Sequence, residues 1–255
     1  LSIHGVPEER IHVVGIPHYD RYLGHVRALN GEAHARAREE FMRSIGADPS
    51  RKLILFVPTG DRYISRDGTN EDDCAVLGLL EGLARDRAHI HVRFPLADTV
   101  HWLEARAPRS GTTVEQLDKQ RFGSRRFVEL TAEDDAHLAD LLLATDLVVT
   151  GPSTIGVDAA LFDTPIIYVA FDGEDERPYF ESVRRYYDYE QFAPVLESAG
   201  VAYARTVEEF AAALERYLGD RGADRVGRER LIATQAWRLD GESTERLAAI
   251  LLKYI

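Results

Sequence analysis

The sequence has 255 residues, of which 45% are hydrophobic and 29% are charged, and its net charge at pH 7 is −12. This composition is typical of a globular protein with a sizeable core. The acidic charge argues against a nucleic-acid-binding protein, which would carry a basic surface. The single cysteine, Cys74, excludes an intrachain disulfide and a cysteine-based metal cluster. We therefore expect a cytoplasmic protein. A local basic patch could still bring the full-length protein to the inner face of the membrane.

Short apolar runs alternate along the chain with segments of helical periodicity. The apolar runs predict strands that are buried on both faces, at Leu53–Val57, Ile90–Phe94, Phe127–Leu130, Leu147–Thr150, Pro165–Phe171 and Val201–Ala204. Helices are predicted between them at Glu71–Asp86, Asp134–Thr145 and Thr206–Leu218, the last of which opens with a capping box formed by Thr206 and Glu209. This alternation predicts an α/β fold with a doubly wound parallel sheet.

Two stretches depart from the alternation. Residues 1–30 are predicted to be a linker with an edge strand at Ile11–Val14, and residues 31–255 to be one α/β domain. Because the sequence begins with Leu1 rather than Met, we expect a missing N-terminal domain to join at this linker. The segment Pro108–Ser124 combines glycine, threonine and charged residues, and we predict an insertion or a mobile connection there.

The strongest candidate for a ligand site follows the predicted strand Leu147–Thr150. A Gly-Pro turn leads to Ser153 and Thr154 and then to a helix that contains Asp158. In open parallel sheets, ligands bind beyond the carboxyl ends of the strands, and a helix that begins there directs free N–H groups at phosphate. The two hydroxyls could bind phosphate oxygens, and Asp158 could accept a hydrogen bond from a ribose or polyol hydroxyl. The alternative is an ordinary helix cap, and the local pattern does not separate the two.

Two other predicted strands end in residues that suit a diphosphate. The run Leu55–Val57 leads into Thr59, Gly60 and Arg62, and a second predicted strand contains Arg93. A guanidinium group can bind a diphosphate through two hydrogen bonds. A lone arginine in a loop, however, is more often a solvated surface side chain.

Other conspicuous residues favour structural roles. Tyr186, Tyr187 and Tyr189 have a spacing typical of core aromatics, and His89 and His91 would share one face of a strand. The sequence contains no HExxH, GxSxG, Walker A or GxGxxG motif, so metalloprotease, hydrolase, P-loop and dinucleotide-binding functions lack their usual support. These residues assign no catalytic group. We expect no metal ion and no cofactor beyond a nucleotide donor.

The segment Asp146–Asp172 resembles the signature of CDP-glycerol glycerophosphotransferase-like proteins and neighbouring GT-B glycosyltransferases. In that signature a strand and two hydroxyl residues precede a helix with an acidic residue, and a second strand leads to an aspartate. Further similar pieces are Val14–Asp20, Leu55–Arg62, Asp172–Tyr189 and Asp240–Arg246. The resemblance implies the Rossmann-like C-terminal donor-binding domain of a GT-B enzyme, with the acceptor domain and its catalytic base upstream of Leu1.

The resemblance also implies a set of donor-binding residues and a role in cell-envelope polysaccharide synthesis. The set is Thr59, Gly60, Arg62, Arg93, Ser153, Thr154, Asp158 and Asp172. Three departures from the family pattern matter: Phe94 replaces a histidine, Gly60–Asp61 replaces a tryptophan, and Arg184–Arg185 replaces Arg-Gly. These departures favour transfer from a UDP- or CDP-linked sugar over transfer of glycerol phosphate.

Three alternatives stay open at this point. One is a CDP-glycerol, or polyol-phosphate, phosphotransferase of the teichoic-acid type, which the donor that binds would distinguish from a glycosyltransferase. The acceptor is expected to be a glycan or a polyol phosphate, bound by the missing N-terminal domain. Another is a nucleotide-binding module without turnover, favoured by the lost histidine. The third is an enzyme similar to UDP-GlcNAc 2-epimerases, whose Glu-Arg-Pro pattern resembles Glu176–Pro178.

Overall fold

The computed structural model describes residues 5–28, 31–60, 71–94, 109–115, 131–173 and 176–255. Six parallel strands form one sheet in the order β3-β2-β1-β4-β5-β6. The strands are β1 (Lys52–Val57), β2 (Ala88–Arg93), β3 (Thr112–Glu115), β4 (Leu147–Thr150), β5 (Ile166–Val169) and β6 (Ala202–Ala204). The predicted α/β fold with a parallel sheet is confirmed.

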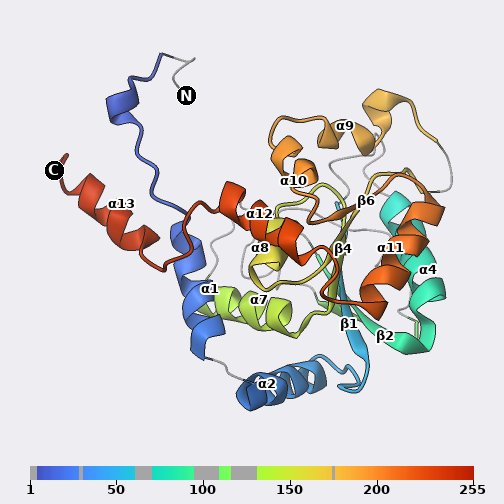
Figure 1. The fold of residues 1–255 in the computed structure, drawn as a ribbon. Coiled ribbons are helices and arrows are strands. Elements are labelled where there is room, and N and C mark those ends of the chain that lie inside the picture. Colours follow the sequence, from blue (N-terminus) through green and yellow to red (C-terminus); the bar gives the residue numbers. More distant parts are fainter. Residues whose placement is uncertain (1–4, 29–30, 61–70, 95–108, 116–130, 174–175) are drawn as a thin grey trace, which may run out of the picture.

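Helices cover both faces of the sheet (Figure 1). One face is covered by α4 (Glu71–Ala84) and α11 (Val207–Gly219). The other is covered by α1 (Pro17–Ala28), α2 (Gly31–Ser44), α7 (Ala132–Ala144), α8 (Ile155–Leu161) and α12 (Arg225–Gln235). The remaining elements are η2 (Glu8–Arg10), η3 (Arg85–Arg87), η4 (Tyr179–Glu181), α9 (Arg184–Tyr187), α10 (Ala193–Glu197) and α13 (Ser243–Leu251). Among the described residues, no helix is both long and apolar enough to cross a lipid bilayer.

Strand β1 shows how the sheet supports two cores. Leu53, Leu55 and Val57 pack on the side of α7 and α8, whereas Ile54 and Phe56 pack on the side of α4 and α11. Successive side chains of a strand point to opposite faces, so both core layers draw on the same five-residue run. This explains why the strand is continuously apolar in the sequence.

The strand order reverses at the centre of the sheet. From β1 the chain proceeds outward to β2 and β3, then returns to place β4 against the free edge of β1 and continues to β5 and β6. In open α/β sheets, ligands bind beyond the carboxyl ends of the strands at such a reversal. The loops that follow β1 and β4 are therefore where a site is expected.

Two sequence predictions are wrong. No strand forms at Ile11–Val14; helix α1 begins instead at Pro17, and its Tyr19 and Tyr22 are buried in the core. The segment Pro108–Ser124 contains the edge strand β3, which pairs with β2. Its sequence, Thr-Thr-Val-Glu, has no apolar run because an edge strand is only partly covered. The predicted strand Phe127–Leu130 lies outside the described residues.

The three predicted helices are confirmed with small shifts of their ends. The cap of α11 forms as expected, with the Thr206 hydroxyl accepting a hydrogen bond from the N–H of Glu209 (3.2 Å). The Glu209 carboxylate, however, accepts from the N–H of Arg205 (2.7 Å), one residue before the cap. A full capping box occurs instead at α7, between Thr131 and Asp134. The predicted domain boundary at residue 30 stays a prediction, although α1 packs against α7 and α13.

Candidate functional site

A cleft of about 480 Å³ opens at the carboxyl ends of β1, β2 and β4. This volume lies in the range of small-molecule sites, about 300–1,000 Å³. Five of the residues predicted from the sequence line it, although they come from three strand ends: Thr59, Arg93, Ser153, Thr154 and Asp158. The other wall is formed by Tyr186 of α9 and by three residues that follow this helix, Tyr189, Gln191 and Phe192. The sheet thus brings together residues almost a hundred positions apart in the sequence, at the reversal of strand order.

The loops after β1 and β4 are held close together at the base of the cleft. The Thr150 hydroxyl donates a hydrogen bond to the carbonyl oxygen of Val57 (3.0 Å). Next to it, a Cβ atom at Gly151 would lie 2.1 Å from the Thr59 hydroxyl oxygen. A side chain at position 151 would therefore force the Thr59 side chain, which lines the cleft, to move.

The two hydroxyl residues after β4 have different roles. The Ser153 Oγ accepts a hydrogen bond from the N–H of Ile155 (3.3 Å), and the Ser153 carbonyl oxygen accepts one from the buried Tyr168 hydroxyl (2.9 Å). Thr154 is the N-cap residue of α8, but its side chain makes no capping hydrogen bond and is exposed. Ser153 thus helps to hold the start of α8 in place, whereas Thr154 is an exposed residue of the cleft lining.

Asp158 lies one turn into α8, and one of its oxygens is already bound. The Tyr19 hydroxyl of α1 donates a 2.8 Å hydrogen bond to Asp158 Oδ1. Burial raises the pKa of Asp158 above its ordinary value, although the hydrogen bond from Tyr19 opposes this shift. Burial and the nearby Asp158 charge raise the pKa of Tyr19, which keeps its proton on the hydroxyl as the donor.

Arg93 is buried at the end of β2, and its guanidinium forms an ion pair with Glu115 at the paired position of β3. Glu115 also contacts His91 Nε2 and His137 Nε2, each at 3.1 Å. Burial would raise the pKa of Glu115, but these hydrogen bonds and the Arg93 charge hold it well below its ordinary value. Arg93 therefore reaches the cleft as part of a charged cluster. Sequence reasoning missed Glu115 and His137, since Glu115 lies in the segment predicted to be an insertion.

The other three predicted residues do not line the cleft. Gly60 follows Thr59 with a φ of 94°, and its N–H donates to Asp73 Oδ2 (3.1 Å). Asp172 is buried, and its carboxylate accepts hydrogen bonds from the N–H groups of Val183 (2.8 Å) and Arg177 (3.4 Å), so it fixes the loop before α9. Arg62 lies outside the described residues. The donor-binding role of these three residues stays a prediction.

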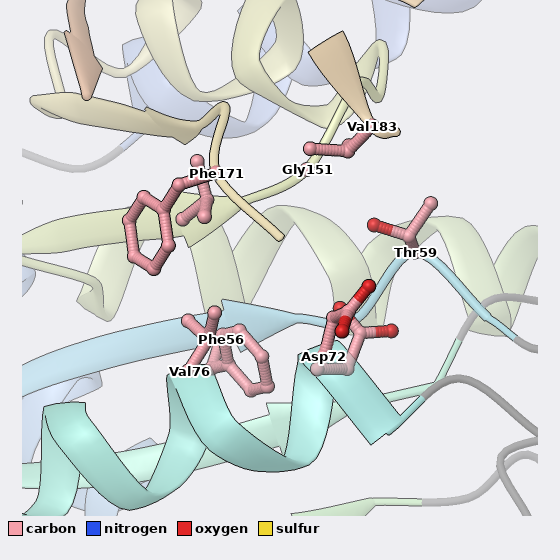
Figure 2. A pocket seen from close by; sticks show the side chains of 9 residues that line it. Phe56, Thr59, Asp72, Val76, Gly151, Phe171 and Val183 are labelled. Atoms are coloured by element: carbon pink, nitrogen blue, oxygen red, sulfur yellow. The ribbon is translucent and has the colours of Figure 1, made fainter. Parts of the chain in front are cut away.

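A second, much smaller cavity lies on the other side of Thr59, between the ends of β1 and β4 and the start of α4 (Figure 2). Phe56, Val76 and Phe171 give it apolar walls, and Asp72 lies at its edge. The Asp72 carboxylate accepts a hydrogen bond from Arg177 (2.8 Å). The volume of this cavity, about 10 Å³, is no more than one water molecule needs. The large cleft is the only one of these two that could admit a nucleotide.

The prediction of structural tyrosines holds for Tyr187 but not for its neighbours. Tyr187 is buried, and its hydroxyl donates to the carbonyl oxygen of Val169 (2.7 Å). Tyr186 and Tyr189 line the cleft, with their ring centroids 5.5 Å apart. Residues three apart on a helical turn lie on one side, whereas the residue between them points elsewhere. The Arg185 guanidinium lies 4.6 Å from the Tyr186 ring centroid and adds a positive charge to this wall.

Among the described residues, no group of three or more His, Cys, Asp or Glu side chains is arranged to hold a metal ion. That donor binding needs no metal ion stays a prediction.

The parallel sheet, its reversal point and the cleft define a Rossmann-like α/β domain of the GT-B type. Residues 2–253 match the family described as CDP-glycerol:poly(glycerophosphate) glycerophosphotransferase. The chain belongs to this family of transferases, as its sequence resemblance implied. No curated protein matches the chain in sequence.

Solved structures with the same fold include a polymerase and two epimerases. The wall teichoic acid polymerase TagF matches with a TM-score of 0.61 and 15% identity, over 98% of this chain and 53% of that chain. The UDP-GlcNAc 2-epimerase of Methanocaldococcus jannaschii, in complex with UDP-GlcNAc and UDP, has a TM-score of 0.58, 13% identity and coverages of 99% and 57%. The UDP-GlcNAc 2-epimerase of Neisseria meningitidis, bound to UDP-GlcNAc, matches with a TM-score of 0.59 and 11% identity, over 99% of this chain and 58% of that chain. At these identities the likeness shows the fold alone, and the chain spans a little over half the length of each.

Proposed function

We propose that the cleft binds the diphosphate of a nucleotide-activated donor, and that the full-length protein transfers glycerol phosphate or a related polyol phosphate from it. The observation that carries this proposal is the convergence of Thr59, Arg93, Ser153 and Thr154 on one cleft at the reversal of strand order. Such a position is where α/β folds bind phosphorylated ligands. Membership of the glycerophosphotransferase family favours a polyol phosphate over a sugar as the transferred group.

The donor would use both walls of the cleft. Its diphosphate would lie against the hydroxyls of Thr59 and Thr154, with the Arg93 guanidinium on the β2 side, because charge-assisted hydrogen bonds are the strongest that phosphate can make here. Its base would stack on Tyr186 or Tyr189, since aromatic rings bind the faces of bases.

The two candidate reactions release different nucleotides. In polyol-phosphate transfer, an acceptor hydroxyl attacks the β-phosphorus, a new P–O bond forms, and the bond to the nucleoside monophosphate breaks. In glycosyl transfer, the acceptor attacks the anomeric carbon of a sugar, and a nucleoside diphosphate leaves. In both reactions the acceptor proton passes to a base. We assign no base within the described cleft, where Phe94 occupies the position at which the family has a histidine.

We also propose that donor binding needs no divalent metal. The Arg93 guanidinium and the N–H groups after Ser153 supply positive charge where a metal would otherwise act. Calorimetry with and without EDTA tests this. We expect equal affinities, and a loss greater than about tenfold, or roughly 1.4 kcal/mol, would contradict the proposal.

The cleft itself is tested by titrating the chain with CDP-glycerol, CMP, CDP, UDP and UDP-GlcNAc. We expect CDP-glycerol to bind best. Ser153→Asp places a carboxylate beside the phosphate, so binding should be lost, while the variant keeps its stability because Asp can also accept the N–H of Ile155. Thr154→Ala removes a hydroxyl but keeps the backbone N–H groups, and should weaken donor binding by about 1–3 kcal/mol.

Thr206→Asp is the matched control, because it puts the same charge at the cap of α11, which covers the opposite face of the sheet. Its affinity should equal that of the wild-type chain. Unchanged binding by Ser153→Asp would refute the cleft as the phosphate site. Tighter binding of UDP-GlcNAc than of CDP-glycerol would instead favour a nucleotide sugar as the donor, as in glycosyl transfer or epimerisation.

A further inference from the structure

His137 of α7 and Arg93 of β2 contact the same carboxylate oxygen of Glu115. The His137 Nε2 atom lies 3.1 Å from Glu115 Oε1, and the Arg93 guanidinium forms its ion pair with that same oxygen. Arg93 lines the cleft, and so does Leu138, which follows His137 in α7. A positively charged His137 would therefore compete with Arg93 for one oxygen beside the cleft.

The other oxygen of Glu115 is held by a series of hydrogen bonds along β2 and β3. The His91 Nε2 atom lies 3.1 Å from Glu115 Oε2, and because an ionised carboxylate only accepts, this nitrogen is the donor. The neutral His91 ring then accepts at Nδ1 from the Thr113 hydroxyl (2.9 Å), which in turn accepts from His89 Nε2 (2.8 Å). The His91 side chain is only 3% exposed. His91 is thus a fixed, neutral donor to this oxygen.

His137 is open to solvent, with 38% of its side chain exposed. Its hydrogen bond to Glu115 raises its pKa above the ordinary value, although burial opposes this shift. The charges of Glu115 and Asp140 also raise the pKa of His137, whereas the charge of Arg93 lowers it. From α2, the ring of Phe41 packs against His137 with centroids 5.5 Å apart. Because Nε2 donates to Glu115 in both states of the ring, the titrating proton is the one at Nδ1.

We propose that donor binding is coupled to protonation of His137. When the ring is neutral, the Glu115 carboxylate neutralises Arg93. When the ring is charged, it binds Glu115 Oε1 as a charge-assisted donor, and the Arg93 guanidinium is freed for the diphosphate of the donor. His137 is in this scheme a positioning residue, since it acts on the ligand through Glu115 and Arg93. The inference rests on the proposed function.

The coupling works in both directions. A charged His137 adds a positive charge to an ion pair that is otherwise neutral, so an anion binds more tightly. By the same linkage, a bound diphosphate favours the protonated ring. The gain in affinity is present while His137 is protonated, below its raised pKa, and is lost as the pH rises through that value. Near that pH, binding of the donor must therefore take up protons from the buffer.

Calorimetry with CDP-glycerol at pH 6 and pH 9 is the central test. Each phosphate of this ligand is substituted on both sides and keeps a constant charge over that range, so a change in affinity reports on the protein. We expect the wild-type chain to bind on the order of tenfold more tightly at pH 6. Titrations at one intermediate pH in two buffers with different ionisation enthalpies measure the proton uptake, which a purely structural histidine would not produce.

Two variants of His137 separate charge from packing. His137→Gln keeps a donor for Glu115 but cannot become charged, so it should bind weakly at both pH values and take up fewer protons than the wild-type chain. His137→Lys is charged at both pH values and should bind tightly at both. His34→Gln is the matched control, because His34 of α2 contacts the opposite end of α7 at the carbonyl oxygen of Leu143 (3.4 Å). It should keep the wild-type pH dependence.

A double-mutant cycle with Glu115→Gln tests whether His137 acts through this carboxylate. At pH 7, His137→Gln should weaken binding in the wild-type background. It should have little effect beside Glu115→Gln, because Arg93 is then no longer neutralised, and additive losses would remove the positioning role. A pH dependence that survives His137→Gln, or a His137→Lys variant that binds as weakly as His137→Gln, overturns the proposal.

The outcomes separate this inference from the function on which it rests. A wild-type chain that binds no nucleotide overturns both. A wild-type chain that loses CDP-glycerol on Ser153→Asp, but binds it equally well at pH 6 and pH 9, keeps the cleft and removes the coupling to His137.

Discussion

Arg93 and Glu115 stand opposite each other on β2 and β3, and their side chains form an ion pair at the edge of the cleft. The carboxylate that fixes Arg93 also neutralises it, and His91 and His137 share the same carboxylate. A bound phosphate would therefore compete with Glu115 for the guanidinium. How strongly the cleft attracts phosphate depends on this pair as much as on Arg93 alone.

We expect Glu115→Gln to bind the donor more tightly than the wild-type chain. The amide oxygen can still accept from Arg93, so the guanidinium stays oriented, but its charge is no longer cancelled. Stability should fall by about 3 kcal/mol, because a buried charge loses its partner. Calorimetry at two salt concentrations and urea denaturation measure the two effects.

Arg93→Gln serves as the comparison for this variant. It should also be destabilised, because Glu115 then loses its arginine partner and keeps only His91 and His137, but it should bind the donor more weakly. Affinities that fall together in both variants would mean that the pair matters only for the local fold.

A second prediction concerns acid stability and His89. Burial, followed by the charges of His91 and Arg51, lowers the pKa of His89 to about 4. In the unfolded chain the pKa of His89 has its ordinary value near 6.5. Between pH 6.5 and pH 4 the unfolded chain therefore binds a proton at His89 that the folded chain does not. This contribution lowers the stability of the fold as the pH falls from 6.5 towards 4, by up to about 3 kcal/mol. His89→Gln should lose less stability than the wild-type chain over that range, as measured by urea denaturation at pH 7 and pH 4.5. Parallel losses in the two proteins would contradict the assignment.

A third prediction compares two arginines that bind the same carboxylate. Arg228 is 1% exposed, and it donates to Asp163 as well as to the carbonyl oxygens of Ala223 (2.6 Å) and Arg221 (3.0 Å). Arg225 also binds Asp163, at 2.6 Å, but its side chain is exposed. A lysine cannot reproduce the planar set of donors. Arg228→Lys should therefore destabilise the chain by about 2–4 kcal/mol, and Arg225→Lys by less than about 1 kcal/mol.

Urea denaturation of both variants checks the comparison between Arg228 and Arg225. Equal effects would mean that the buried hydrogen bonds to the carbonyl oxygens add nothing.

The sequence predicts the fold well because the four central strands, β1, β2, β4 and β5, are buried along all or nearly all of their length. Leu53–Val57 and Leu147–Thr150 are recognisable as strands from their composition alone. Strand β3 is not predicted from the sequence, because Thr112–Glu115 lies at the edge of the sheet and needs no apolar run. Helix α1 is not predicted either, for another reason. Its buried tyrosines are spread among charged residues, so the segment lacks a clear apolar stripe.

The site is predictable where it depends on strand ends. Thr59, Arg93 and Ser153 meet because parallel strands end at one edge of the sheet, which follows from the sequence pattern. The hydrogen bond from Tyr19 to Asp158 and the pairing of Glu115 with Arg93 depend on which helix or edge strand lies beside the cleft. No local pattern encodes that. The family resemblance also placed Asp172 among the donor-binding residues, whereas its carboxylate binds backbone N–H groups in this structure.

The last prediction tests the packing that holds Ser153 and Thr154 in place. Gly156, in the first turn of α8, lies against Tyr168 of β5, and a Cβ atom there would be 2.1 Å from the tyrosine hydroxyl oxygen and 2.7 Å from Cζ. The ring is fully buried and cannot move aside, so Gly156→Ala must push α8 away and strain the hydrogen bond from Tyr168 to Ser153 (2.9 Å). We expect a loss of about 1–3 kcal/mol in stability, with weaker donor binding. Gly82→Ala in α4 is the matched control, because no atom lies within 4 Å of its added Cβ. It should stabilise the chain by up to about 1 kcal/mol through helix propensity alone and leave binding unchanged. Thermal denaturation should therefore shift in opposite directions for the two variants, and a stabilised Gly156→Ala would show that α8 does not need this close approach to the sheet.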